Sequence, residues 1–87
     1  MSTVIEAGQS RTPRLTSNPR VHLVAAAPAL WRVLDHAGVV IGHLQGVPHP
    51  GGSRFRARRF HAPSHAFRDL GDFWSADDAV ECLRFAR

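Results

Sequence analysis

The chain has 87 residues and a formal net charge of +4, and all eleven of its basic residues are arginine. This length allows one small domain and leaves little room for an enzyme with both a substrate pocket and a supporting shell. The positive charge favours an anionic partner, nucleic acid first, because net charge bears on association rather than on fold.

The cysteine content and the hydropathy of the chain favour a cytoplasmic protein. A single cysteine, Cys82, excludes an internal disulfide framework. The stretch MSTVIEAGQSRTPRLTSNPR lacks the apolar core of a signal peptide, and no apolar run approaches the roughly 20 residues that cross a bilayer. We therefore expect a soluble, cytoplasmic protein without membrane contact.

The first 20 residues are rich in Ser, Thr, Pro, Gly and Arg and have neither helical nor strand periodicity. Such a segment buries too little apolar surface to offset the entropy of ordering it. We therefore expect residues 1–29 to be a disordered basic tail and linker, and residues 30–87 to be the folded domain. Within the linker, VHLVAAAP (Val21 to Pro28) is apolar enough to dock on the domain, as a short helix or as an edge strand.

The segment LWRVLDHAGVVIGHLQ, from Leu30 to Gln45, has two β-branched and aromatic runs around a turn signal, which predicts a β-hairpin. Gly38 is expected to take the left-handed position of a three-residue loop. The expected pairs are Asp35 with Val39, Val33 with Ile41, and Trp31 with His43. This register places Trp31, Val33, Val39 and Ile41 on one side of the hairpin.

The other side of the hairpin is not cleanly polar, since Leu34, Val40 and Leu44 lie on it. An apolar second face needs a cover, which either the docked linker or a partner subunit would supply. Leu34, Val40 and Leu44, together with Phe60, are therefore the candidate residues of a homodimer or protein interface.

Two further strands are expected after the hairpin. In SRFRARRF (Ser53 to Phe60), the two-residue period places Arg54, Arg56 and Arg58 on one face, here called the arginine stripe, and Phe55, Ala57 and Arg59 on the other. The preceding Gly46–Ser53 segment has two prolines and three glycines and is expected to be a flexible loop. FRDLGDFW predicts a short last strand around Leu70, with Gly71 marking a bulge or a close backbone approach.

The final segment, SADDAVECLRFAR, predicts a helix. Ser75 and Asp78 have the spacing of an N-terminal cap. Asp77 and Asp78 would lie in the first turn, where acidic side chains interact favourably with the helix dipole. An apolar stripe, expected to pack on the sheet, consists of Ala76, Ala79, Val80, Leu83 and Ala86. The predicted fold is therefore α+β, with three to four antiparallel strands packed against one C-terminal helix.

No set of side chains forms a convincing catalytic or metal site, so we expect no enzyme, no cofactor and no small-molecule substrate. A nucleophilic Cys82 would need a convergent base and an oxyanion site. A structural zinc site at His49, His61 and His65 would need a second cysteine or a paired motif. The core needs Trp31, Phe55, Phe73 and Phe85, which leaves Phe60 as the candidate for stacking on nucleic-acid bases.

Charge is segregated along the chain. From Arg54 to Arg68 there are five arginines and no carboxylate, whereas five of the seven acidic residues lie from Asp69 onward. Arginines on a sheet face can contact DNA phosphates and make paired hydrogen bonds to guanine. We therefore expect a non-enzymatic module that binds duplex DNA through Arg32, Arg54, Arg56, Arg58, Arg59 and Arg68.

Two alternatives to duplex DNA binding stay open. The arginine stripe can be a solvated outer face whose charges discourage aggregation at a sheet edge. The domain can also be a protein-interaction or homodimeric assembly module without nucleic-acid contact, in which the apolar hairpin face matters more than the arginines.

The motifs W-x-V and G-x-x-x-G-x-L in a hairpin, followed by F-x-A-R, L-G-x-F and S-x-D-D-A-V, resemble the DNA-binding domains of the AP2 and integrase amino-terminal type. The likeness runs from Trp31 to Leu83 and leaves out the first 29 residues. It implies that the sheet face opposite the helix enters the major groove, with the arginine stripe and Arg32 in that role. The phrases RFRARRF and LGDFW also resemble those of small actinobacterial proteins.

Overall fold

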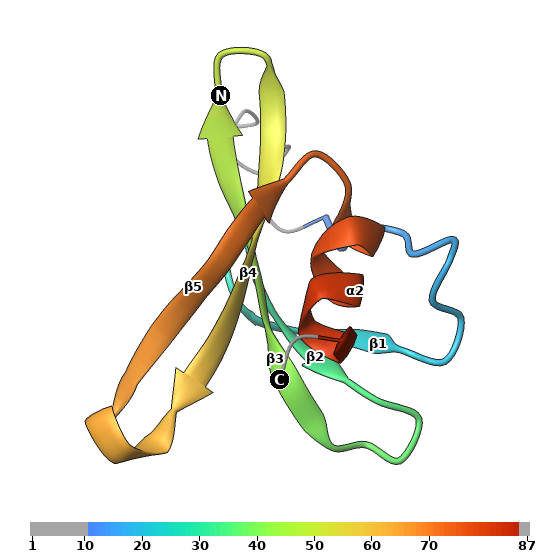
Figure 1. Cartoon of the computed structure of the whole chain (residues 1–87). Coiled ribbons are helices and arrows are strands. Elements are labelled where there is room, and N and C mark those ends of the chain that lie inside the picture. Colours follow the sequence, from blue (N-terminus) through green and yellow to red (C-terminus); the bar gives the residue numbers. More distant parts are fainter. Residues whose placement is uncertain (1–10, 86–87) are drawn as a thin grey trace.

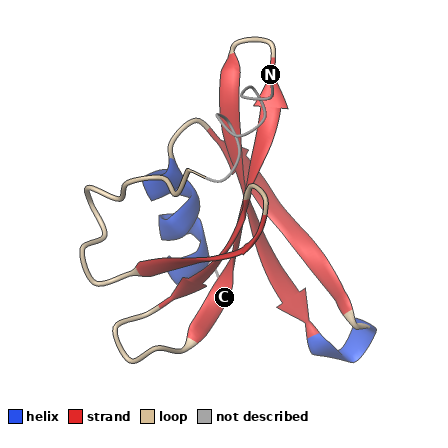
Figure 2. Cartoon of the chain, turned by 180° about the vertical axis from the view of Figure 1, so that it is seen from behind, coloured by secondary structure: helices blue, strands red, loops and turns tan. Residues whose placement is uncertain are grey.

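The computed structural model of the chain describes residues 11–85. Five antiparallel strands pair in chain order, so β1 and β5 are the two edges of one sheet (Figures 1 and 2). The strands are β1 (His22–Ala27), β2 (Leu30–Leu34), β3 (Val40–His49), β4 (Gly52–His61) and β5 (Ala66–Phe73). A short helix η1 (Ala62–Ser64) joins β4 to β5, and helix α2 (Ala76–Phe85) follows. The fold is α+β as predicted, but the sheet has five strands rather than three or four.

The additional strand is β1, in the apolar segment for which the sequence left helix and edge strand open. It pairs with β2, so that Leu23 lies opposite Val33 and Ala25 lies opposite Trp31. Val21, just before β1, is buried in the core, and Leu23 packs against the core. The Ala run has no strong preference of its own, so pairing with β2 and this burial select the strand.

Residues 11–20, which we assigned to the tail, pack on the domain instead, with Thr12 hydrogen-bonded to Trp31 and the segment from Thr16 to Asn18 hydrogen-bonded to α2. The Asp77 carboxylate accepts hydrogen bonds from the backbone N–H groups of Thr16 and Ser17, each at 2.9 Å. Asn18 is buried; its Nδ2 donates to Asp77 Oδ1 at 2.9 Å, and its Oδ1 accepts from Arg84 Nη1 at 2.7 Å. The domain as described therefore begins well before residue 30, and residues 1–10 of the expected tail lie outside the described residues.

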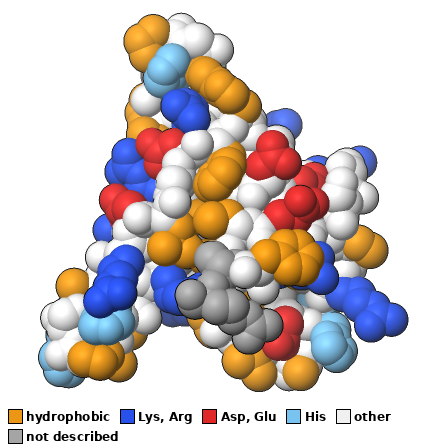
Figure 3. Space-filling view, in the orientation of Figure 1, with side chains coloured by type: hydrophobic (Ala, Val, Ile, Leu, Met, Phe, Trp, Pro, Cys, Tyr) orange, Lys and Arg blue, Asp and Glu red, His pale blue; other side chains and the backbone are white. Residues whose placement is uncertain are grey.

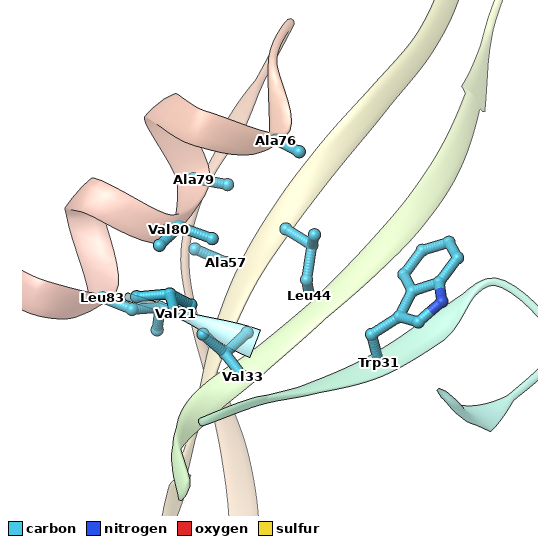
Figure 4. Close-up of a cluster of buried hydrophobic side chains, with 9 residues drawn as sticks. All are labelled: Val21, Trp31, Val33, Leu44, Ala57, Ala76, Ala79, Val80 and Leu83. Carbon is cyan, nitrogen blue, oxygen red and sulfur yellow. The ribbon is translucent and has the colours of Figure 1, made fainter. Parts of the chain in front are cut away.

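The core lies between α2 and the inner face of the sheet (Figure 4). It consists of Val21, Trp31, Val33, Leu44, Ala57, Ala76, Ala79, Val80 and Leu83. The predicted helix stripe is thus confirmed, except that Ala86 lies outside the described residues. The backbone N–H of Asp78 donates to Ser75 Oγ at 3.0 Å, which confirms the N-terminal cap.

The hairpin between β2 and β3 has the predicted turn but a different register. Gly38 has φ 84°, which confirms the left-handed loop position, and the N–H of Asp35 donates to the carbonyl of Val39 at 2.9 Å. An irregularity at Ile41 then shifts the pairing, so that Val33 lies opposite Gly42 and Trp31 opposite Leu44. Val39 is therefore exposed rather than on the core face that the predicted register required, whereas Ile41 still packs against the core as the extra residue of the irregularity.

Gly42 and Leu44 take the core positions of β3 instead, and the close approach of α2 explains why. A Cβ atom at Gly42 would lie 2.5 Å from Leu83 Cδ2 and 2.9 Å from the Arg58 carbonyl oxygen. Only glycine leaves room for α2 at this point of the sheet. The register that places Gly42 under the helix also buries Leu44 completely.

Most of the Gly46–Ser53 segment is strand, so the predicted flexible loop is wrong. β3 and β4 pair as far as His49 opposite Gly52, and the turn is reduced to Pro50 and Gly51. Pro48 is tolerated because the N–H groups of a strand alternate between its two sides. The N–H of Gly46 donates toward β2, to the Ala29 carbonyl at 2.8 Å. Two residues further on, Pro48 faces the same side beyond the end of β2.

Candidate nucleic-acid interface

The candidate interface is the outer face of the sheet, opposite α2. The helix packs on β3, β4 and β5, and within residues 11–85 no second long helix lies on the opposite face (Figure 1). Cross-strand partners share a face, so the register defines two rows on the outer side. One row contains Arg32, His43, Arg58 and Asp69, and the next contains Leu30, Gln45, Arg56 and Asp72.

The arginine stripe lies on this outer face, as predicted, but β5 places two carboxylates beside it. Arg56 donates from Nε and Nη2 to the two carboxylate oxygens of Asp72, at 2.8 and 3.0 Å. Arg58 donates from Nε to Asp69 Oδ1 at 2.8 Å and from Nη1 to Gln45 Oε1 at 3.1 Å. Basic and acidic side chains therefore lie next to one another along the arm formed by β4 and β5 (Figure 3).

A β-bulge explains why the sequence did not show this pairing. In a regular strand, residues three apart such as Asp69 and Asp72 point to opposite faces. The register shift at Leu70 pairs Ala57 with Gly71 and Arg58 with Asp69, which returns Asp72 to the outer face. Of the two alternatives predicted at Gly71, the structure shows the bulge, with Leu70 beside Gly71 as its extra residue, and the bulge allows both carboxylates to reach the stripe.

These ion pairs set the charge of the outer face. The hydrogen bonds between Arg56 and Asp72 raise the pKa of Arg56 and lower the pKa of Asp72. Arg32 is exposed and forms no ion pair within the described residues. Four arginines and two aspartates leave the face with a formal charge of +2. The face is therefore positive, but far less so than the arginine stripe alone would make it.

Three aromatic rings are exposed beside the stripe, of which the sequence predicted only Phe60. The exposed fractions are 55% for Trp74, 48% for Phe60 and 39% for Phe67. The guanidinium carbon of Arg54 lies 4.6 Å from the centre of the Trp74 ring, and that of Arg58 lies 5.0 Å from the centre of Phe67. The two-residue period of β5 places Phe67 with Asp69, which is the signal that could have identified it.

Histidines complete two aromatic clusters, one at each end of the stripe. His43 contacts the Phe67 ring edge-on with 4.9 Å between ring centres, and His49 contacts Trp74 in the same way at 4.8 Å. Burial lowers the pKa of His43, and the neighbouring Arg32 and Arg58 lower it further. His43 is therefore held in the neutral form near pH 7 and adds no charge to the face.

Two of the six predicted arginines lie elsewhere. Arg59 points to the side of the sheet that α2 covers, where its Nη2 donates to the Leu83 carbonyl at the end of the helix. Arg68 is the cross-strand partner of Arg59 and donates to His61 Nε2 at 3.1 Å. The structure therefore brings together Arg32, Arg54, Arg56 and Arg58 and separates them from Arg59 and Arg68.

Three of the four predicted interface residues lie near one another, and the fourth is buried. Leu44 is completely buried in the core, so it is not available to a partner. Leu34 and Val40 lie opposite each other near the β2–β3 turn, and Val40 and Phe60 line one shallow hollow between β3 and β4. Phe85, expected in the core, is 68% exposed near the end of α2.

Three other features bear on function: metal-ligating groups, the cysteine thiol and the character of the helices. Within residues 11–85, no group of three or more His, Cys, Asp or Glu side chains could hold a metal ion. Cys82 is a half-buried free thiol on α2. Neither helix in the described part of the chain has the length and apolar character that a membrane span requires.

Comparison with known proteins adds no family to this description. No protein-family model, no curated protein and no solved structure matches the chain. The likeness to AP2 and integrase amino-terminal domains therefore stays a prediction from sequence motifs.

Proposed function

We propose that the chain is a non-catalytic nucleic-acid-binding module that uses the outer face of its sheet. The observation that carries this proposal is the pairing of arginines with exposed rings on one face: Arg54 over Trp74 and Arg58 over Phe67. Proteins that bind single strands combine a basic surface with rings on which bases stack. The net charge of the whole chain, +4, favours the same class of partner.

The geometry favours single strands over the duplex DNA that the sequence indicated. The carboxylates of Asp69 and Asp72 reduce the attraction of the stripe for closely spaced duplex phosphates. With a weaker electrostatic attraction, a larger share of the binding free energy would come from the exposed rings of Phe60, Phe67 and Trp74. Every base offers a flat face on which such a ring can stack. From Arg54 to Phe60, β4 spans ~20 Å, enough for a few nucleotides of an extended strand.

The ion pairs also orient the guanidinium groups. Arg56 uses Nε and Nη2 for Asp72, and the remaining N–H groups of its guanidinium are left for a phosphate or a base edge. A guanidinium held in this way loses less side-chain entropy when it binds. In the proposed interface the arginines thus position the strand, and the rings provide most of the binding free energy.

The test is fluorescence anisotropy of a labelled oligothymidine and of a duplex of equal length, titrated with protein at several salt concentrations. The single strand should bind more tightly, with a log-log salt slope of about −0.7 per neutralised phosphate, hence about −1 to −2. Replacing both Phe67 and Trp74 by Leu should weaken binding about tenfold or more. Arg32→Gln should make the salt slope less steep.

Phe85→Leu is the matched control, because it removes an exposed ring that also stacks with an arginine, Arg84, but lies on α2. It should leave binding unchanged, and circular dichroism should show that all variants are folded. If the duplex binds more tightly than the single strand, and the ring substitutions leave its affinity unchanged, the result would support the duplex prediction instead. Absence of binding to both nucleic acids would end the proposal.

A second candidate function, homodimeric assembly, is favoured by the edge strand β1. Its sequence HLVAAA has no Asp, Glu, Lys or Arg and no proline, and Val24 is exposed. Uncharged, exposed edge strands are prone to pair with another chain. The opposite edge, β5, is protected by Arg68, Asp69 and Asp72 and by the bulge at Leu70.

A further inference from the structure

A large cleft lies where the inner face of the sheet extends beyond α2. It has a volume of about 730 Å³, within the range of small-molecule sites. One wall is the N-terminal segment from Arg11 to Arg14, and the other is formed by β3 and β4 around Gly46 and Phe55. Trp31 and Ala29 lie between these walls. The helix packs over β3 to β5, so among the described residues this end of the sheet is covered by the N-terminal segment.

The base of the cleft is aromatic and is held in place. The Trp31 ring is almost completely buried, and its Nε1–H donates to Thr12 Oγ1 at 3.2 Å. This hydrogen bond ties the N-terminal segment to the ring and satisfies the only polar atom of the indole. Phe55 adds a second ring, and Gly46 between them has no side chain to fill the space.

The entrance of the cleft is positive. Arg11 and Arg14 are both exposed and both line the cleft, and among residues 11–85 no Asp or Glu lines it. This contrasts with the arginine stripe, in which Arg56 and Arg58 are paired with carboxylates. Two arginines beside an aromatic base, with no carboxylate from the described part of the chain, form a surface complementary to an anion that carries an apolar ring.

The free edge of β3 at the cleft does not suit an added strand. β2 begins at Leu30, and the Ala29 carbonyl accepts from Gly46, so within residues 11–85 β3 continues from Val47 to His49 without a paired strand on that side. Pro48 removes the N–H that an incoming strand would need there. A compact ligand therefore fits this cleft better than an extended peptide.

We propose that this cleft is a binding site for a small molecule with a planar aromatic or apolar group and one anionic group, a carboxylate, sulfonate or phosphate. The ring would lie against Trp31 and Phe55, and the anion would lie between Arg11 and Arg14. This site is separate from the outer-face interface and independent of nucleic-acid binding. It departs from the sequence-based expectation that the chain has no small-molecule ligand.

The test uses anilinonaphthalene sulfonate, an aromatic anion, and its uncharged analogue N-phenylnaphthylamine as probes of the full chain. The sulfonate should bind at one saturable site, and its binding should shift the NMR signals of the Trp31 indole N–H and the Gly46 amide. Replacing both Arg11 and Arg14 by Ala should lower the affinity for the sulfonate about tenfold. The same change should leave the affinity for the uncharged probe unaltered.

Two further variants make the result specific. Arg20→Ala removes an exposed arginine of the same N-terminal segment that does not line the cleft, so sulfonate binding should be unchanged. Gly46→Val keeps both arginines but places a side chain in the cleft, where a Cβ would be in ordinary contact with Ala29 Cβ at 3.6 Å. This variant should lose both probes. Equal binding of the sulfonate by the double Ala variant, or NMR shifts confined to other residues, would overturn the proposal.

Discussion

At the residue scale, Asp77 joins the N-terminal segment to the helix through one carboxylate. Burial raises its pKa, but hydrogen bonds from Thr16, Asn18 and Ser17 outweigh burial and lower the pKa from 3.8 to about 2. A lowered pKa means that the folded state holds the ionised form more strongly than the unfolded chain does. The resulting stabilisation is complete above the unfolded pKa near 4 and is lost as the pH falls toward 2.

Asp77→Asn should therefore lower the free energy of unfolding at pH 7 by about 1–3 kcal/mol, because it removes hydrogen bonds to a charged acceptor. The difference between wild type and variant should shrink from pH 4 to pH 2, as measured by urea unfolding at each pH. Asp78→Asn is the control, since Asp78 is exposed in the same turn of α2. A difference that stays constant over this pH range would contradict the assignment of the stabilisation to the ionised carboxylate.

At the element scale, β1 is the strand whose conformation the local sequence pattern did not predict. The helix α2 was predictable because Ser75 and the apolar stripe from Ala76 to Leu83 are local signals. The strand β1 was not, because its Ala run takes its conformation from pairing with β2.

On the outer face, too, the local sequence did not determine which residues pair across strands. The two-residue period placed Arg54, Arg56 and Arg58 on one face correctly. Their partners on β5 depended on the bulge at Leu70, which the sequence marked only through Gly71 and without a register. A one-residue shift in a strand moves side chains between faces, so candidate sites in a sheet are predictable only as far as the register is.

The uncharged edge of β1 predicts self-association. Two β1 strands paired across a two-fold axis would form one continuous sheet with a small interface, hence a weak dimer. Light scattering after size exclusion should show a dimer that Val24→Lys converts to a monomer, because an edge lysine discourages strand pairing. Val39→Lys is the matched control, since Val39 is exposed at the β2–β3 turn. A wild-type monomer at the highest concentration reached would rule out assembly through β1.

At the scale of the whole molecule, the core depends on residues far apart in the chain. Val21 closes the core that α2 forms with β2, β3 and β4, and Leu15 and Leu23 pack against it. The bonds from Thr16, Ser17 and Asn18 to Asp77 connect positions about 60 residues apart. A domain of this size buries a small core, so each of these contributions is a large part of its stability.

A chain that begins at Leu30, the domain boundary expected from the sequence, should therefore fail to fold, whereas one that begins at Arg11 should fold. The shorter chain loses β1, the buried Val21 and the hydrogen bonds to Asp77. Each buried aliphatic side chain contributes ~1.5–3 kcal/mol, against a total of ~5 kcal/mol for a small domain. Circular dichroism and thermal unfolding of both chains measure this directly. Cooperative unfolding of the chain from Leu30, at the same temperature as the longer one, would show that residues 11–29 are the dispensable linker that the sequence predicted.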